Sequence, residues 1–101
     1  MKIIQELSDM ISEEIGDAEK YARRALKEKD ENQKLSDLFF RLSNEEMNHM
    51  ALLHSAVTEI IAQYRREHGD PPEAMLAVYD YLHGKQIQHA AEVKSLQSMY
   101  Q

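Results

Sequence analysis

The fold is decided by residues 39–60, FFRLSNEEMNHMALLHSAVTEI, in which apolar positions recur in alternating steps of three and four. This spacing predicts one continuous stripe along a helix that packs lengthwise in a bundle. Glu46 and His49 occupy two consecutive positions of the stripe, so ionisable side chains interrupt an otherwise apolar surface. The complete stripe is Phe39, Leu42, Glu46, His49, Leu53, Ala56 and Ile60.

The preceding segment, residues 3–29, repeats the pattern and contains a third interruption. Its three- and four-residue steps predict a helix about 40 Å long, at 1.5 Å per residue. Glu14 stands in the middle of the stripe, where a carboxylate is costly to bury unless something compensates its charge. The complete stripe is Ile4, Leu7, Ile11, Glu14, Ala18, Tyr21 and Ala25.

Breaks in the periodicity divide the chain into three helices. Asp30 and Gln33 have the spacing of a capping box, so we expect a second helix over residues 31–67, antiparallel to the first. Gly69 should end it, with Asp70 as the N-cap and Pro71 as the first residue of a third helix. The sequence therefore predicts a single all-α domain over residues 1–101, with an antiparallel helical hairpin (1–68) and a third long helix (73–101) for packing or oligomerisation.

The third helix has the pattern of a packing surface. Two pairs have the three-residue spacing of metal ligands, Asp80 with His83 and His89 with Glu92, but both flank the stripe, and we expect neither to bind a metal. The stripe consists of Met75, Tyr79, Leu82, Gln86, Ala90, Val93, Leu96 and Tyr100.

Composition excludes several classes of function. The formal net charge of −6 and the lack of a basic patch argue against a nucleic-acid partner. With no cysteine, a metal would be held by oxygen and imidazole ligands. No apolar run approaches the roughly 20 residues that span a bilayer, and the amino terminus lacks the apolar core of a signal peptide. We expect a cytoplasmic protein without a membrane partner.

Glu14, Glu46 and His49 are the predicted metal ligands. A Glu and a His three residues apart lie on one helix face and reach one point in space, and Glu14 faces them from the antiparallel helix. Carboxylate and imidazole ligands together suit iron, manganese or zinc. Tyr21, two turns from Glu14, is expected to pack in the core or to donate its hydroxyl to a ligand carboxylate. His54 is expected to lie at the surface or to form an outer contact to the ligands.

These motifs resemble the ferritin-like di-iron superfamily, in which one helix donates a Glu and the next a Glu-x-x-His pair. Residues 14–21, EIGDAEKY, resemble the first liganding helix of rubrerythrins and encapsulated ferritins, and residues 45–49, EEMNH, resemble the second. The resemblance implies iron as the cofactor and a ferroxidase-like activity that oxidises ferrous iron with oxygen or peroxide. The carboxyl terminus shows no Gly- or Pro-rich extension, so we do not expect docking to a protein shell.

The resemblance also implies how the site is completed. A di-iron carboxylate site needs about four Glu and two His from four helices, and this chain supplies half of that set. A two-fold homodimer, hairpin against hairpin, would give a ferritin-like four-helix bundle with two iron ions per dimer, either alone or within a higher homo-oligomer. In that arrangement Glu46 bridges or chelates, Glu14 is a terminal ligand and His49 gives each ion one nitrogen.

Three structural alternatives stay open from the sequence. A shift of the first stripe by one residue would put Ile15 in the core in place of Glu14; Glu46 could be a surface residue beside Glu45; and His49 could be a hydrogen-bonded core histidine. A second functional hypothesis is a metal-free helical interaction module that binds another protein through the third helix and Tyr79, Tyr81 and Tyr100.

Overall fold

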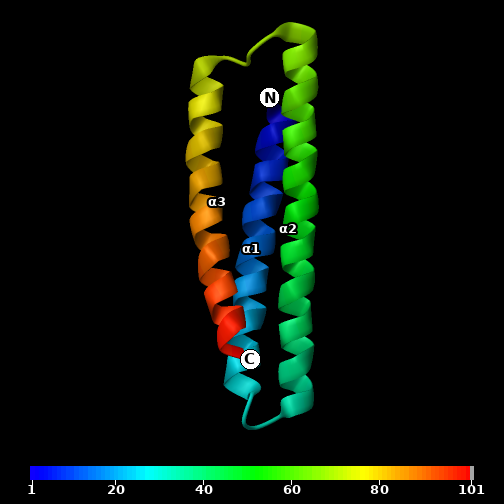
Figure 1. Ribbon diagram of the computed structural model, residues 1–101, viewed down its shortest axis with the longest axis vertical. Helices are drawn as coiled ribbons and strands as arrows, with labels where there is room; N and C mark the ends of the chain where they lie inside the picture. The colour runs from blue at the N-terminus through cyan, green and yellow to red at the C-terminus, as the bar shows by residue number, and fades with distance from the viewer. Residues whose placement is uncertain (101) are drawn as a thin grey trace.

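The computed structural model describes residues 1–100 as three long helices, shown in Figure 1. Helix α1 spans Lys2–Glu28, α2 spans Gln33–His68 and α3 spans Glu73–Tyr100. Because α2 runs back along α1 and α3 returns in the direction of α1, the three form a rod of 55 × 19 × 18 Å. The all-α prediction is confirmed for the described residues, among which no helix is long and apolar enough to cross a bilayer. Gln101, the last residue of the predicted third helix, lies outside them.

The closest packing joins α1 and α2. The Ser36 hydroxyl donates to the carbonyl oxygen of Ala25, and the Ser43 hydroxyl donates to that of Ala18 at 2.7 Å. Ser36 and Ser43 are seven residues apart on α2, and Ala25 and Ala18 are seven residues apart on α1. The two hydrogen bonds therefore repeat the same contact one heptad further along the hairpin. Small side chains let the backbones approach, and the buried hydroxyls are satisfied. The buried apolar residues are Ile4, Ile11, Ile15, Ala18, Ala22, Ala25, Val57, Ala90 and Val93.

Helix α3 packs mainly on α1 and brings a buried polar contact with it. The Gln86 amide nitrogen donates to the Ser8 carbonyl oxygen at 2.9 Å and to the Ser12 hydroxyl at 3.0 Å. One turn further along α3, His89 Nε2 lies 2.5 Å from Glu19 Oε1. Every residue of the stripe predicted for α3 is buried or half-buried, which confirms it as a packing surface.

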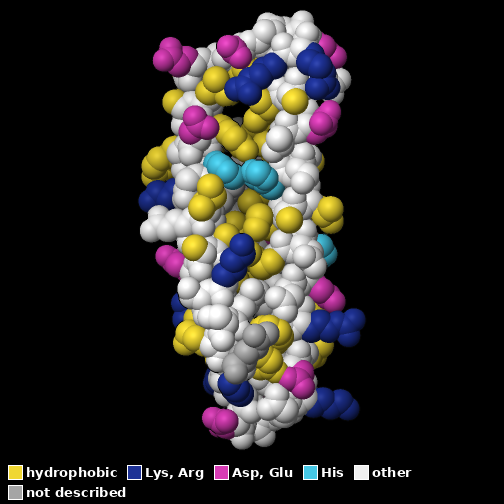
Figure 2. Space-filling view, in the orientation of Figure 1, with side chains coloured by type: hydrophobic (Ala, Val, Ile, Leu, Met, Phe, Trp, Pro, Cys, Tyr) yellow, Lys and Arg dark blue, Asp and Glu magenta, His cyan; other side chains and the backbone are white. Residues whose placement is uncertain are grey.

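Helices α2 and α3 contact each other much less. They meet near the carboxyl end of α3, where Tyr100 stacks on Phe40 at 4.2 Å between ring centroids and Gln97 donates to Ser43 at 2.9 Å. Between that end and the middle of the rod lies a cavity of about 420 Å³, whose floor includes Ile15 of α1. Figure 2 shows apolar side chains along this channel between α2 and α3.

The predicted capping box at the first turn is wrong. The N-cap of α2 is Asn32, whose side-chain oxygen accepts a hydrogen bond from the Leu35 amide at 3.1 Å. The amides of Glu31 and Asn32 both donate to the carbonyl oxygen of Glu28 and extend the end of α1 into the turn. Helix α2 therefore begins two residues later than expected.

The predicted N-cap and first residue of α3 are wrong, although α3 begins at Glu73, the start of the predicted range 73–101, and Gly69 ends α2 with a positive φ of 79°. The first carbonyl acceptor of α3 is Pro72, which receives the amides of Met75 and Leu76. Pro72 disfavours the helical conformation at Pro71, the residue before it, so Pro71 is not the first helical residue. Asp70 does not cap the helix and pairs with Arg65 at 3.5 Å.

Candidate metal centre

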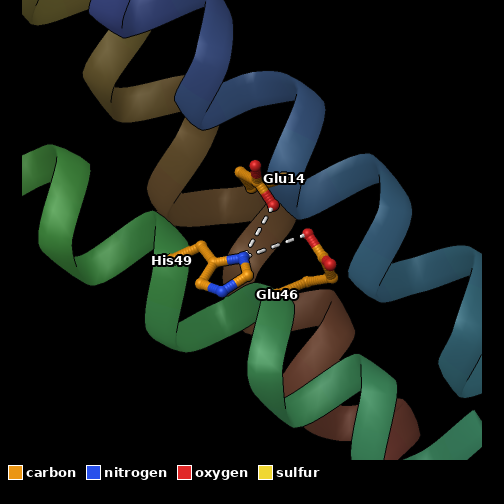
Figure 3. Close-up of side chains that lie close together, drawn as sticks. All are labelled: Glu14, Glu46 and His49. Atoms are coloured by element: carbon orange, nitrogen blue, oxygen red, sulfur yellow. Dashed lines mark ion pairs between the residues drawn. The ribbon is translucent and has the colours of Figure 1, made fainter.

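Glu14 of α1 and Glu46 and His49 of α2 converge on one point near the middle of the hairpin, as Figure 3 shows. One ligand atom from each side chain lies within 4.8 Å of the others. His49 Nδ1 is 3.5 Å from Glu14 Oε2 and 3.7 Å from Glu46 Oε2. The structure thus brings together all three residues that the sequence predicted as ligands, from two antiparallel helices.

The contacts within this cluster are close but incomplete. At 3.5 and 3.7 Å the imidazole nitrogen is too far from both carboxylates for a normal hydrogen bond. Glu14 Oε2 is buried and has no hydrogen-bond partner among the described residues. Buried polar atoms nearly always have a partner, and Glu14 Oε2 is an exception that a bound cation would remove.

The cluster lies at the edge of the core. The buried face of α1 keeps four of the seven predicted positions and has Ser8, Ile15 and Ala22 in place of Leu7, Glu14 and Tyr21. Ile15 is fully buried, so the first of the three alternatives is the observed one. The Glu14 side chain is still only 26% exposed because it leans against α2, and Glu46 is 19% exposed. His49 is 54% exposed and is not a core histidine.

The cluster faces away from α3. Ser12, which contacts α3, precedes Glu14 by two residues, or about 200° around the helix. In Figure 3, α3 passes behind the hairpin and the three side chains lie in front of it. Met10 and Leu52, one turn from Glu14 and His49 on the same faces, are 48% and 70% exposed. This face of the hairpin is therefore open in the single chain.

The side chains next to the three predicted ligands make contacts of their own outside the cluster. Glu45 points to solvent and pairs with Arg41 at 3.2 Å, whereas Glu46 turns toward α1, so the alternative of a surface Glu46 is not observed. Tyr21 stacks on Phe39 at 6.2 Å between centroids and packs rather than supporting a ligand.

The tyrosines of the alternative interaction hypothesis are mostly engaged within the chain. Tyr79 is half-buried and stacks on His83 at 5.7 Å, and its burial raises the pKa of the hydroxyl. Tyr100 stacks on Phe40 and donates a hydrogen bond to Asp37. Tyr81 is 64% exposed and is the one of the three that is free to meet a partner.

Sequence spacing missed two imidazole contacts between helices. His89 was paired with Glu92 by spacing, but it contacts Glu19, whose pKa is lowered first by a hydrogen bond from Arg23 and then by His89. His54 of α2 and His83 of α3 stack with centroids 4.7 Å apart. No single-helix pattern signals either contact, because each joins residues about 30 or 70 positions apart.

In comparisons with protein-family models, curated proteins and solved structures, the chain matches none. Its assignment therefore depends on the geometry of its own residues.

Proposed function

We propose that Glu14, Glu46 and His49 bind a divalent transition-metal ion, and that a second copy of the chain completes a di-iron site that oxidises ferrous iron. The observation that carries this proposal is the convergence of two carboxylates and one imidazole within 4.8 Å, with the Glu14 oxygen buried and unpartnered. Ligand atoms of that chemistry suit iron and manganese, and also zinc.

The distances fit the coordination of a metal. Protein nitrogen and oxygen ligands bind such ions at about 2.0–2.2 Å, which puts neighbouring ligand atoms about 3 Å apart. The measured separations of 3.5 and 3.7 Å from His49 Nδ1 would each close by less than about 1 Å. Side-chain rotation alone can supply that movement, because the backbones of α1 and α2 are already fixed by their serine contacts.

The open face of the hairpin supports completion by a second copy. One chain supplies two carboxylates and one imidazole, and a ferritin-like di-iron site needs about twice that set. A two-fold axis through this face would double the ligands without a new residue type. Met10 and Leu52 would then be covered by the partner, and their burial would favour association.

The roles of the ligands follow the ferritin-like arrangement. Glu46, the least exposed of the three, would bridge or chelate the ions, Glu14 would be a terminal ligand, and His49 would donate a nitrogen to each ion. Bound iron supplies the electrons that oxygen or peroxide accepts. The protein's part is to hold the ions and to adjust carboxylate binding as their charge changes.

The test is an anaerobic titration of the full chain with ferrous iron, followed by oxygen consumption and by measurement of its mass in solution. Changes to outer contacts of metal sites typically cost about 10–100-fold in affinity, and removal of a ligand should cost at least that. We expect Glu46→Ala and His49→Ala to lose iron binding and iron-dependent oxygen uptake. Glu45→Ala is the matched control and should keep both.

The outcomes separate the parts of the proposal. Unaltered iron binding in both ligand variants would refute the site. One ion per chain on a monomer would keep the site and refute the homodimer. Binding of ferrous iron without oxygen or peroxide consumption would refute the ferroxidase-like activity.

A further inference from the structure

The contact between His54 and His83 is another place where metal-ligating side chains from two helices meet. The rings stack with centroids 4.7 Å apart and planes 16° from parallel. Figure 2 shows histidine side chains touching across the channel between α2 and α3. Since these helices otherwise contact each other little along the rod, the imidazole pair is their main link away from the carboxyl end of α3.

One ring nitrogen of this pair has no hydrogen-bond partner among the described residues. This nitrogen, His83 Nδ1, is buried. The pKa of His83 is lowered, first by burial and then by His54, so burial keeps the ring in the neutral form that binds metal ions. A neutral, unpartnered nitrogen beside a second imidazole is available to a ligand.

The space beside the pair contains a carboxylate. A cavity of about 370 Å³ is lined by His54, His83 and Asp80, together with Thr58 and Arg65. Asp80 precedes His83 by one helical turn, so the two side chains share one face of α3. Their ligand atoms and those of His54 do not lie within 4.8 Å of one another, and the side chains would have to rotate to share an ion. Arg65 would oppose a cation there, but its side chain is 51% exposed and its guanidinium lies 3.5 Å from the Asp70 carboxylate, so water and that carboxylate reduce the repulsion.

We propose that His54, His83 and Asp80 form a second metal site, for a divalent ion that prefers imidazole, such as zinc. Rotation of each ring about its Cβ–Cγ bond would turn one nitrogen of each toward the cavity. Two imidazoles and a carboxylate are a common ligand set for zinc. The site shares no residue with the Glu14–Glu46–His49 cluster and does not depend on the function proposed for it.

Metal binding at this second site would join α2 to α3. The separation of α2 and α3 leaves cavities on both sides of the imidazole pair. A bound ion would fix the middle of α3 against α2 and stabilise the folded chain, because the unfolded chain does not hold the three ligands together.

The experiment is a calorimetric zinc titration of the full chain carrying Glu46→Ala and His49→Ala, which removes the first cluster. We expect one zinc ion per chain, and at least a tenfold loss of zinc affinity when His83→Gln or His54→Gln is added. His68→Gln is the matched control, because His68 also stacks on an aromatic ring, that of Tyr64 at 4.7 Å, but faces no second imidazole.

A measurement on the unmodified chain guards against variants that fail to fold. In NMR spectra of the histidine rings, zinc should shift the signals of His54 and His83 and leave those of His68 in place. No zinc binding in the double-variant background, or equal affinity with and without His83→Gln, would overturn the second site. Iron oxidation that survives in the double variant would instead refute the function proposed for the first cluster.

Discussion

The Glu14–Glu46–His49 cluster and the His54–His83 pair differ in the packing of the helices that carry them. The cluster stands on the tightly packed α1–α2 hairpin, where serine hydroxyls bond to the opposite backbone. The pair spans α2 and α3, which are separated by cavities of about 420 and 370 Å³. Tight helix packing fixes the distances between the liganding side chains before a metal binds. Where the helices are loosely packed, the bound metal ion would set those distances.

A separate carboxylate–imidazole contact, between α1 and α3, clarifies what the first cluster lacks. His89 Nε2 lies 2.5 Å from Glu19 Oε1, a direct contact that satisfies both groups without a metal. In the cluster, His49 stays 3.5 Å or more from two carboxylates, and Glu14 keeps an unpartnered oxygen. Similar residue types thus form a closed pair between α1 and α3 and an open site between α1 and α2.

The largest effect on the free energy of unfolding should come from truncating a core residue that lies beneath both the cluster and the histidine pair. Ile15 is fully buried and also lines the cavity beside His83. Ile15→Ala should lower the free energy of unfolding by about 2–5 kcal/mol, the usual cost of truncating a large buried side chain. Glu14→Ala, one residue away at the edge of the core, should change it by less than about 1 kcal/mol in metal-free protein. Denaturant unfolding of both variants measures the difference, and equal losses would contradict the observed orientation of α1.

The next effect should distinguish the two sites by the metals they prefer. Manganous ion favours carboxylates and zinc favours imidazole. At a concentration of 100 times the dissociation constant, either ion should raise the free energy of unfolding by about 2.7 kcal/mol. We expect Glu46→Ala to abolish the gain from manganese and His54→Gln to leave it intact, as followed by thermal melts in each metal. Loss of the manganese effect in His54→Gln would show that the two sites are not separate.

Much of the fold could be predicted from the sequence because apolar spacing fixes helix number and length. The orientation of α1 could not, since Glu14 and Ile15 both fit a stripe of three- and four-residue steps. Ser36 and Ser43, which the spacing treats as polar, are buried because their hydroxyls bond to the backbone of α1 at Ala25 and Ala18, which belong to both stripes. The predicted caps at the two turns were wrong for local reasons. At the second turn, for example, Pro72 restricts the backbone conformation of Pro71.

The candidate sites, like the fold, could be predicted only in part from the sequence. Spacing within α2 puts Glu46 and His49 on one face, and the short turn brings Glu14 opposite them. The contact between His54 and His83 depends on how α3 is rotated on α1, which Gln86 sets through Ser8 and Ser12. The stripe of α3 predicts the face that packs, but it does not predict which residue of α2 lies beside His83, because that depends on the rotation of both helices.

A smaller effect should appear at the closed pair in acid. The pKa of Glu19 is lowered by Arg23 and then by His89, so its folded-state pKa lies below the unfolded value of 4.5. This contribution to stability is present above about pH 4.5 and is lost as the pH falls through the lowered pKa. The difference in unfolding free energy between the protein and Glu19→Gln should therefore shrink between about pH 5 and pH 3. Denaturant unfolding across that range measures it, and a constant difference would contradict the assignment.

The smallest effect should be that of Glu45→Ala, next to a predicted ligand in sequence but turned away from it. Glu45 pairs with Arg41 four residues earlier at 3.2 Å, and both side chains are exposed, at 47% and 79%. Water and salt screen such a pair, so its removal should change the free energy of unfolding by less than about 0.5 kcal/mol. The metal-dependent gain in stability should also be unchanged, because the carboxylate that meets His49 belongs to Glu46. If Glu45→Ala weakened iron or manganese binding as much as Glu46→Ala, general acidity of this segment of α2 would explain the binding, and the converging geometry would not.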